Sequence, residues 1–245
     1  DLVHFLSFNQ PVFYNGPRVT TIHDLTVKYY PAGRSQTDPI RRLAFNWVMA
    51  HAAASDRVIA ISRATKIDIV RDLKVDPERI NIIYEAADAR FQLQSQAAIE
   101  QFRKRVGQPK PYILFVNQWR PHKGLPELIA AFDILKGLHK LPHQLVITGK
   151  PNDHFPELSR AAEASKYRDD IVLPGFVDDA ELPLYYAAAD VTAFPSYYEG
   201  FGLGILESMQ SGTPVVCTKS SSIPEVAGEA GHYVAPHDAA DLARG

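Results

Sequence analysis

Short runs of apolar and β-branched residues alternate with stretches of helical periodicity along the chain. Runs of four or five such residues between polar or turn-forming residues are typical of strands. The pattern predicts strands over residues 19–23, 57–61, 80–84, 112–116, 145–148, 171–173, 191–194, 214–217 and 232–235. Helices are expected between them, over residues 39–51, 63–73, 125–135, 180–189 and 203–211. Repeated alternation of strands and helices with short loops favours an α/β fold with parallel sheets.

A polar, glutamine-rich and basic stretch over residues 89–111 interrupts this alternation. We therefore predict a domain boundary near residue 108, between a first domain of residues 1–108 and a second of residues 109–245. The first domain has only three or four strand candidates, which is few for a complete doubly wound sheet. The chain also lacks an initiator Met and stops in what looks like the opening of a helix. We expect an incomplete N-terminal domain in a chain truncated at both ends.

Composition excludes several classes of protein. The chain has 245 residues and a net charge of −2, so nothing in it suggests a nucleic-acid-binding surface. Cys217 is the single cysteine, which rules out an internal disulfide and a zinc site built from several cysteines. No apolar run approaches the roughly 20 residues that span a bilayer, and the N-terminus lacks the features of a signal peptide. These properties fit a cytoplasmic protein.

The most informative stretch runs from Phe194 to Val216, where a predicted strand leads through a glycine-rich loop into a helix. Such a helix start presents backbone N–H groups and partial positive charge, which suit a phosphate. Glu199 and Glu207 would repel a phosphate but could accept hydrogen bonds from hydroxyl groups. A ligand that carries both groups is a nucleotide-sugar. The alternative is that Glu199 is an ordinary loop carboxylate and Glu207 a solvated helix residue.

A nicotinamide-binding reading is rejected. The glycines at 200, 202 and 204 depart from the G-x-G-x-x-G fingerprint, and no acidic residue ends the next predicted strand. The chain also has no Walker loop, no G-x-S-x-G motif and no Asp-x-Asp pair. His139 and His143 are four residues apart, but Pro142 argues against a continuous helical face. We predict no bound metal.

Further candidates come from the carboxyl ends of the predicted strands, where open α/β sheets bind ligands. His23 could donate to a phosphate or a reacting oxygen, although a histidine bonded to a backbone carbonyl is the alternative. Arg120 and Lys123 follow the strand at 112–116 and could clamp a diphosphate. A solvated basic loop is the alternative for these two cations.

Several segments then resemble the retaining glycosyltransferases of GT-B fold, specifically family 4, the glycosyl transferases group 1. The resemblance is dense around the two glutamates and covers nearly the whole chain. The segments that carry it in the second part are Lys123-Gly124, Gly149, Gly175-Phe-Val177, Pro195-Ser196, Glu199-Gly-Phe-Gly-Leu203, Leu206-Glu207-Ser-Met209, Gly212-Thr-Pro-Val-Val216 and Ile223-Pro-Glu225. Those in the first part are Thr21-Ile-His23-Asp24-Leu25, Val58-Ile-Ala-Ile-Ser62 and Asp88-Ala-Arg-Phe91.

The resemblance implies two Rossmann-like parallel-sheet domains with a cleft between them, and a role for each candidate. Glu207 is similar to the carboxylate that holds the ribose hydroxyls, and Glu199 to the one that holds the donor sugar. Lys123 would stabilise the leaving nucleoside diphosphate with Arg120 as its partner, and His23 would reach towards the sugar. The remaining donor-binding positions implied are Gly149, Phe176, Val177, Gly200, Phe201, Gly202 and Leu203.

The function implied is transfer of a hexose, with retention, from a GDP- or UDP-sugar to a sugar or lipid-linked acceptor, without metal or cofactor. Peripheral membrane contact and self-association through the incomplete N-terminal domain are compatible with this reading. Two alternatives remain: a non-catalytic nucleotide-binding or self-associating fragment, and a nucleotide-sugar epimerase of the same fold.

Overall fold

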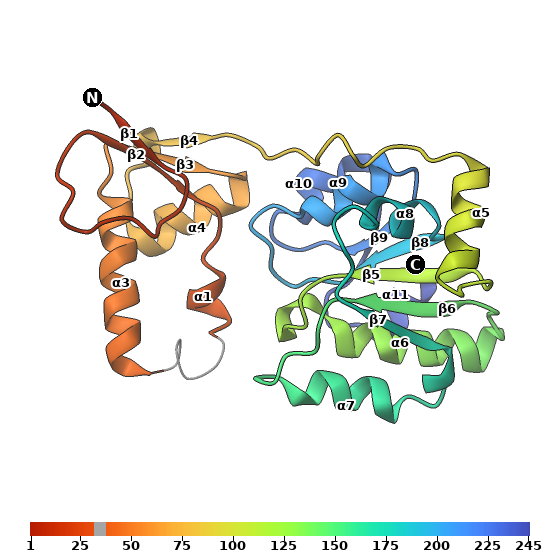
Figure 1. The fold of residues 1–245 in the computed structure, drawn as a ribbon. Coiled ribbons are helices and arrows are strands. Elements are labelled where there is room, and N and C mark those ends of the chain that lie inside the picture. The colour runs from red at the N-terminus through yellow and green to blue at the C-terminus, as the bar shows by residue number, and fades with distance from the viewer. Residues whose placement is uncertain (32–37) are drawn as a thin grey trace. The chain divides into compact units, whose positions relative to one another are not determined.

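The structure is a computed structural model that describes residues 1–31 and 38–245. Its residues cluster into two units. The first unit comprises residues 1–85 together with the four-residue segment Tyr198–Phe201. The second comprises residues 86–197 and 202–245 (Figure 1). Each unit is an α/β structure built on a parallel sheet, as the alternation in the sequence predicts.

The first unit contains a four-stranded sheet in the order β1-β2-β3-β4, in which every neighbouring pair is parallel. Three of these strands match the predictions, whereas β1 was not predicted. Asp38 and Ser62 cap α3 and α4 through their side chains, which accept from the amides of Arg41 and Thr65. The elements are β1 (Val3–Phe5), β2 (Arg18–Ile22), α1 (Thr26–Tyr29), α3 (Pro39–Ala53), β3 (Arg57–Ala60), α4 (Arg63–Leu73), η1 (Pro77–Arg79) and β4 (Ile80–Ile82).

The core of the first unit packs α3 and α4 on the sheet. Ile22 and Val58 of the strands lie in one apolar cluster with Ala52 of α3 and Ile69 of α4. The helical periodicity over residues 39–51 is confirmed, but only the C-terminal part of α3 contributes fully buried residues to this core.

The N-terminal part of α3 turns apolar side chains outward. Ile40, Leu43 and Trp47 are 79%, 72% and 54% exposed. A 3.6-residue period identifies which residues share a face, but it does not identify what covers that face.

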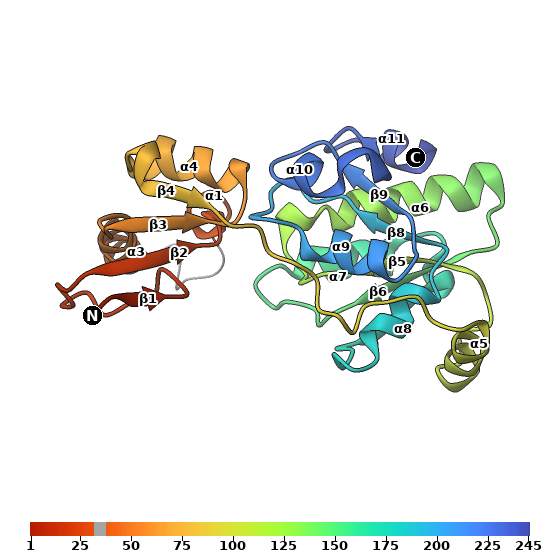
Figure 2. The same cartoon turned by 90° about the horizontal axis from the view of Figure 1, so that it is seen from above.

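The second unit contains a six-stranded parallel sheet in the order β10-β9-β8-β5-β6-β7. Figure 2 shows β9, β8, β5 and β6 side by side in this order. Its strands are β5 (Tyr112–Val116), β6 (Gln144–Thr148), β7 (Ile171–Gly175), β8 (Val191–Phe194), β9 (Val215–Thr218) and β10 (Gly231–Val234). Its helices are α5 (Gln96–Arg105), η2 (Pro121–Lys123), α6 (Leu125–His139), α7 (Pro156–Ala164), η3 (Arg168–Asp170), α8 (Leu182–Ala187), α9 (Leu203–Gln210), α10 (Ile223–Ala227), η4 (Gly228–Ala230) and α11 (Ala239–Arg244).

Helices cover both faces of this sheet. Successive residues of β5 pack on opposite faces of the sheet. Phe115 packs with α6, whereas Leu114 packs with α5 and α8. A third cluster joins β8 and β9 to α9 and α10. Because β5 is covered on both faces, its continuously apolar sequence is the one expected of a central parallel strand.

The boundary between the units lies at Glu85/Ala86, not near residue 108. Residues 89–111 are mostly polar, but they include two buried aromatic residues that pack against the second unit. Phe102 of α5 is 2% exposed, and its ring lies 4.8 Å from that of Tyr185 on α8. Phe91 packs edge-on against Tyr186 at 5.7 Å. Two buried aromatic rings outweigh the polar composition of this stretch, so it folds with the domain that follows it.

Candidate functional site

The strand order of the second unit reverses between β5 and β8, and ligands of open α/β sheets bind outside the carboxyl ends of strands at such a point. The loops that follow these two strands are in contact. The amide of Tyr197 donates to the carbonyl oxygen of His122 at 2.7 Å. A Cβ on Gly124 would lie 2.2 Å from the carbonyl oxygen of Pro195, so only glycine permits this approach. The fold thus brings the predicted basic loop against the loop that leads towards the two glutamates.

The basic loop concentrates positive charge. Arg120 and Lys123 are both half-buried, and the Nε atom of Arg120 is buried without a hydrogen-bond partner among the described residues. His122, which the sequence reading did not single out, is buried between them. Burial, together with the charges of Lys123 and Arg120, lowers its pKa to about 3. His122 is therefore neutral near pH 7, and the two flanking cations supply the charge of the loop.

Glu207 lies on α9 and is held by a buried tyrosine. The hydroxyl of Tyr186, on α8, donates to Oε2 of Glu207 at 3.0 Å. Burial raises the pKa of the Glu207 carboxyl above its ordinary value of 4.5, while the bond from Tyr186 opposes this shift. Asp179 also raises this pKa and Arg90 lowers it, so both charges lie within electrostatic reach. Tyr186 fixes Oε2, and Oε1 has no hydrogen-bond partner among residues 1–31 and 38–245, which suits the carboxylate to accept further hydrogen bonds.

Gly204 makes room for this arrangement. A Cβ at this position would lie 3.1 Å from the ring of Phe194 and 3.2 Å from the hydroxyl of Tyr186. Contacts this short require the neighbours to move, so a larger residue would press on the hydroxyl that positions Glu207. The glycine therefore has a packing role within α9.

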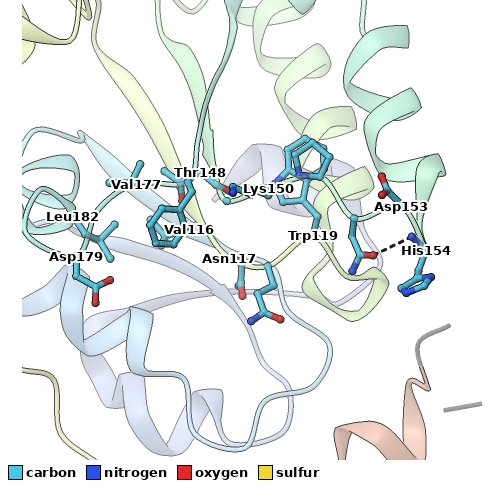
Figure 3. Close-up of a pocket in the computed structure, with 15 residues that line it drawn as sticks. Val116, Asn117, Trp119, Thr148, Lys150, Asp153, His154, Val177, Asp179 and Leu182 are labelled. Carbon is cyan, nitrogen blue, oxygen red and sulfur yellow. Dashed lines mark hydrogen bonds between the residues drawn. The ribbon is translucent and has the colours of Figure 1, made fainter. Parts of the chain in front are cut away.

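A cavity of about 710 Å³ opens at the carboxyl ends of β5, β6 and β7 (Figure 3). Asp179 and Leu182 lie at one end of it and Asp153 and His154 at the other. The ammonium of Lys150 lies 6.0 Å from the centroid of the Phe176 ring. The lining residues are Val116, Asn117, Gln118, Trp119, Thr148, Gly149, Lys150, Pro151, Asn152, Asp153, His154, Phe176, Val177, Asp179 and Leu182. This volume lies within the roughly 300–1000 Å³ typical of small-molecule sites.

Backbone contacts shape the floor of this cavity. The indole N–H of Trp119 donates to the carbonyl oxygen of Thr148 at 3.2 Å. The amide of Gly149 donates to the carbonyl oxygen of Gly175 at 2.8 Å. Gly149 has a φ of +91°, and a Cβ there would lie 2.5 Å from the carbonyl oxygen of Asn117. Only glycine therefore allows the backbone at residue 149 to adopt this conformation so close to Asn117.

Gly149→Ala is expected to destabilise the second unit by about 2 to 3 kcal/mol, because strain at positive φ adds to a clash with a backbone oxygen. Gly175→Ala is the matched control, since Gly175 has a φ of +78° but open space around it. The control should cost only about 1 to 2 kcal/mol. Denaturant unfolding followed by Trp119 fluorescence, in a Trp47→Phe background, measures both. Equal losses of unfolding free energy in the two variants would show that the contact with Asn117 is unimportant.

In the first unit, the sheet brings His23 and Glu85 together at the carboxyl ends of β2 and β4. The Nε2 atom of His23 lies 3.7 Å from Oε1 of Glu85, and the two side chains are 45% and 28% exposed. Burial raises the pKa of Glu85, His23 lowers it, and Asp24 raises it. The carboxylate of Glu85 faces the ring at this distance and favours one orientation of the histidine.

The segment Tyr198–Phe201 is anchored at two points within the first unit. The hydroxyl of Tyr198 donates to Asp68 Oδ2 at 2.9 Å and accepts from the amide of Leu25 at 3.1 Å. Glu199 lies between this anchor and the next one, at Gly200.

The anchor at Gly200 is its carbonyl oxygen, which accepts from the hydroxyl of Ser62 at 2.7 Å and from that of Thr65 at 3.0 Å. A Cβ at this position would lie 2.3 Å from the carbonyl oxygen of His23. Glu199 is thus carried by a backbone that is fixed on both sides, which limits the positions its carboxylate can take.

Tyr198→Phe is expected to destabilise the first unit by about 1 to 3 kcal/mol, because the buried carboxylate of Asp68 loses a donor and the Leu25 amide loses its acceptor. Denaturant unfolding followed by Trp47, in a Trp119→Phe background, reports on this unit. Tyr14→Phe is the control, since its hydroxyl makes one exposed contact of 3.4 Å to Pro17. Equal stabilities of the two variants would refute the anchoring role.

The predicted site residues fall into both units. His23, Glu199, Gly200 and Phe201 belong to the first. The second contains Arg120, Lys123, Gly149, Phe176, Val177, Gly202, Leu203 and Glu207. Tyr186, Tyr198 and Asp68, which hold the glutamates or their backbone, carried no signal in the sequence because each reads as an ordinary helix or loop residue.

Residues 1–31 and 38–245 contain no group of three or more His, Cys, Asp or Glu side chains placed to hold a metal ion. In the same ranges, no helix has the length and apolar character needed to cross a membrane.

Comparison with known proteins gives matches over both parts of the chain. The family model described as "Glycosyl transferases group 1" matches residues 97–245, and that described as "Glycosyltransferase Family 4" matches residues 1–91. O-antigen chain mannosyltransferase B of Escherichia coli is 29% identical over 94% of this chain and 61% of its own length. D-inositol 3-phosphate glycosyltransferase of Corynebacterium kroppenstedtii is 30% identical over 93% of this chain and 52% of its own. The chain thus spans between half and two thirds of these relatives.

Solved structures give the same fold. Sucrose-phosphate synthase from Thermosynechococcus elongatus superposes with a TM-score of 0.77 at 25% identity, covering 99% of this chain and 62% of its own. HepE from Anabaena, in complex with UDP and glucose, superposes at 0.75 and 24% identity, covering 93% and 60%. The first family model alone covers more than half of the 245 residues. The chain therefore belongs to the GT-B glycosyltransferases of family 4.

Proposed function

We propose that the protein transfers a hexose from a nucleoside-diphosphate sugar to a sugar or lipid-linked acceptor, with retention and without a metal ion. The observation that carries the proposal is the Glu207 carboxylate, fixed by the buried hydroxyl of Tyr186 at 3.0 Å. A partly buried carboxylate is costly unless it is compensated, and the hydroxyls of a ribose supply compensation through charge-assisted hydrogen bonds. The cavity at the ends of β5 to β7 offers space and the exposed ring of Phe176 for the nucleobase.

Lys123 and Arg120 are assigned to the diphosphate. When the bond between the anomeric carbon and the diphosphate oxygen breaks, its electron pair leaves with the phosphate, which gains negative charge. Two cations fixed beside that oxygen stabilise the charge as it develops, a contribution often worth several kcal/mol. Glu199 is assigned to hydroxyls of the transferred sugar, and His23, oriented by Glu85, to a hydrogen bond with that sugar.

Retention follows in this proposal from attack on the face that the diphosphate leaves. The acceptor hydroxyl forms the new bond to the anomeric carbon, and its proton passes to an oxygen of the departing phosphate. No protein nucleophile is needed in such a step. The Escherichia coli relative is named a mannosyltransferase, which favours mannose as the first hexose to test.

A non-catalytic nucleotide-binding module is the second candidate, because the chain spans only 61% of that relative. One experiment separates the two candidates. UDP, GDP and their sugars are titrated by calorimetry, and transfer and donor hydrolysis are then assayed with GDP-mannose and UDP-glucose, with product configuration read by NMR. Transfer with retained configuration supports the proposal, and nucleotide binding without turnover supports the module. Epimerised free sugar nucleotide would instead reveal an epimerase, and a folded protein that binds neither nucleotide would refute the donor site altogether.

A further inference from the structure

A second cavity, of about 200 Å³, lies within the first unit. Its walls come from the segment after β1, from α1 and from α3. It is smaller than the roughly 300–1000 Å³ of pockets that enclose whole drug-sized ligands. A site of this size suits one charged group and the atoms next to it.

Three cations line this cavity: Lys28 of α1, and Arg41 and Arg42 of α3. Lys28 has a carboxylate partner, since its Nζ atom lies 3.3 Å from Oδ1 of Asp72. Neither arginine has a carboxylate within 4.0 Å among residues 1–31 and 38–245, and both side chains are exposed. Two guanidinium groups with free donors therefore face one small cavity.

Arg41 and Arg42 do not stabilise α3 at the positions they occupy. They occupy the first turn, where the helix dipole is positive and a cation costs about 0.3 to 1 kcal/mol. The first turn contains no acidic residue, and the carboxylate of the capping residue Asp38 accepts from the backbone amide of Arg41. Like charges so close together also repel each other. An anion in the cavity would reverse both penalties.

The remaining walls suit a phosphate group with a small apolar part. Asn46 follows Arg42 by four residues on α3, so both side chains lie on one helix face, and its amide adds hydrogen-bond donors. Phe8 and Phe45 form an apolar wall, with ring centroids 5.5 Å apart in an edge-to-face arrangement. Arginine forks match phosphate oxygens in geometry as well as charge.

We propose that this cavity binds the phosphate group of a phosphorylated ligand, with Arg41 and Arg42 as its principal donors and Asn46 beside them. The cavity shares no lining residue with the candidate donor site. The phosphate could come from a soluble phosphomonoester or from the headgroup of an anionic lipid. The exposed apolar side chains of Ile40, Leu43 and Trp47 on the same helix make the second source worth a separate arm of the test.

The test titrates the full chain with inorganic phosphate and with glycerol 3-phosphate by calorimetry. The double variant Arg41→Gln/Arg42→Gln is expected to lose about 10- to 100-fold in affinity. Arg160→Gln, an exposed arginine on α7, is the charge-matched control and should bind as wild type. The conservative variant Arg42→Lys should retain part of the affinity, since it keeps the charge but loses the fork.

A parallel arm adds vesicles of phosphatidylcholine with or without one quarter phosphatidylglycerol and follows Trp47 emission. A response to the anionic vesicles that the double variant abolishes identifies a lipid headgroup, whereas saturable binding of the soluble phosphates alone identifies a free phosphoester. The proposal is overturned if wild type binds neither, or if the double variant binds as well as wild type. It is also overturned if phosphate binding disappears with Lys123→Met and persists in the double variant, because the phosphate then occupies the donor site.

Discussion

Replacing Lys123 by methionine is expected to lower kcat for glycosyl transfer by about 100- to 1000-fold, because the departing diphosphate loses a fixed cation at the moment its charge develops. The loss should fall on kcat more than on donor KM, since the ground-state donor already carries most of its charge before the bond breaks. Steady-state kinetics with the best donor from the binding panel measure both constants. The neutral His122 beside Lys123 cannot take over this role near pH 7, because burial holds its pKa at about 3.

Lys166→Met removes a lysine that is exposed and lies outside the cavities described above, and it should leave both constants unchanged. A Lys123 variant that turns over at the wild-type rate would remove this residue from the leaving-group role. A variant whose KM rises while kcat stays constant would reassign it to ground-state binding.

Replacing Glu207 by alanine is expected to weaken nucleoside diphosphate binding by about 100-fold or more, since two hydrogen bonds from ribose hydroxyls to a charged group are lost. The effect should vanish for the 2′,3′-dideoxy nucleotide, which wild type and variant should bind equally weakly. Calorimetric titration of the four combinations isolates the contact. Glu163→Ala, which removes an exposed carboxylate from α7, is the control.

The pH dependence of nucleotide binding gives an independent test of Glu207. Burial raises the pKa of its carboxyl above 4.5, and the ribose hydroxyls require the ionised form. Affinity should therefore fall as the pH is lowered through that raised pKa, and the Glu207→Gln variant should lack this step. A carboxyl with a raised folded-state pKa stabilises the fold at low pH and loses that contribution as the pH rises through it. Near pH 7, Glu207→Gln should consequently fold at least as stably as wild type while binding nucleotide poorly.

Local chemistry made most of the fold predictable. Asp38 and Ser62 were identified as helix caps because a short side-chain acceptor before an apolar period has few other uses. The strand β5 was recognisable because both of its faces are buried. Strand β1, in contrast, has only three residues, with an exposed histidine at its centre. It is too short to show an alternation of apolar and polar residues.

Predictions that depended on long-range packing were less successful. The domain boundary was misplaced because the composition around α5 is polar, while the burial of Phe102 depends on a helix some 80 residues later. For the site, the sequence indicated Glu207 and Lys123, since glycine-rich loops and strand ends mark such positions. The sequence could not indicate Tyr186 or Asp68, whose roles arise only when distant elements meet. The catalytic and binding roles of the site residues stay predictions.

The chain crosses between the two units three times, at residues 85/86, 197/198 and 201/202. The protein therefore cannot be divided into two expression fragments by one cut. A fragment that begins at Ala86 would still carry Tyr198 and Gly200, but without Asp68, Ser62 and Thr65, which satisfy their polar groups in the whole chain. Workers who need the second unit alone would have to redesign these four residues as a short, polar turn.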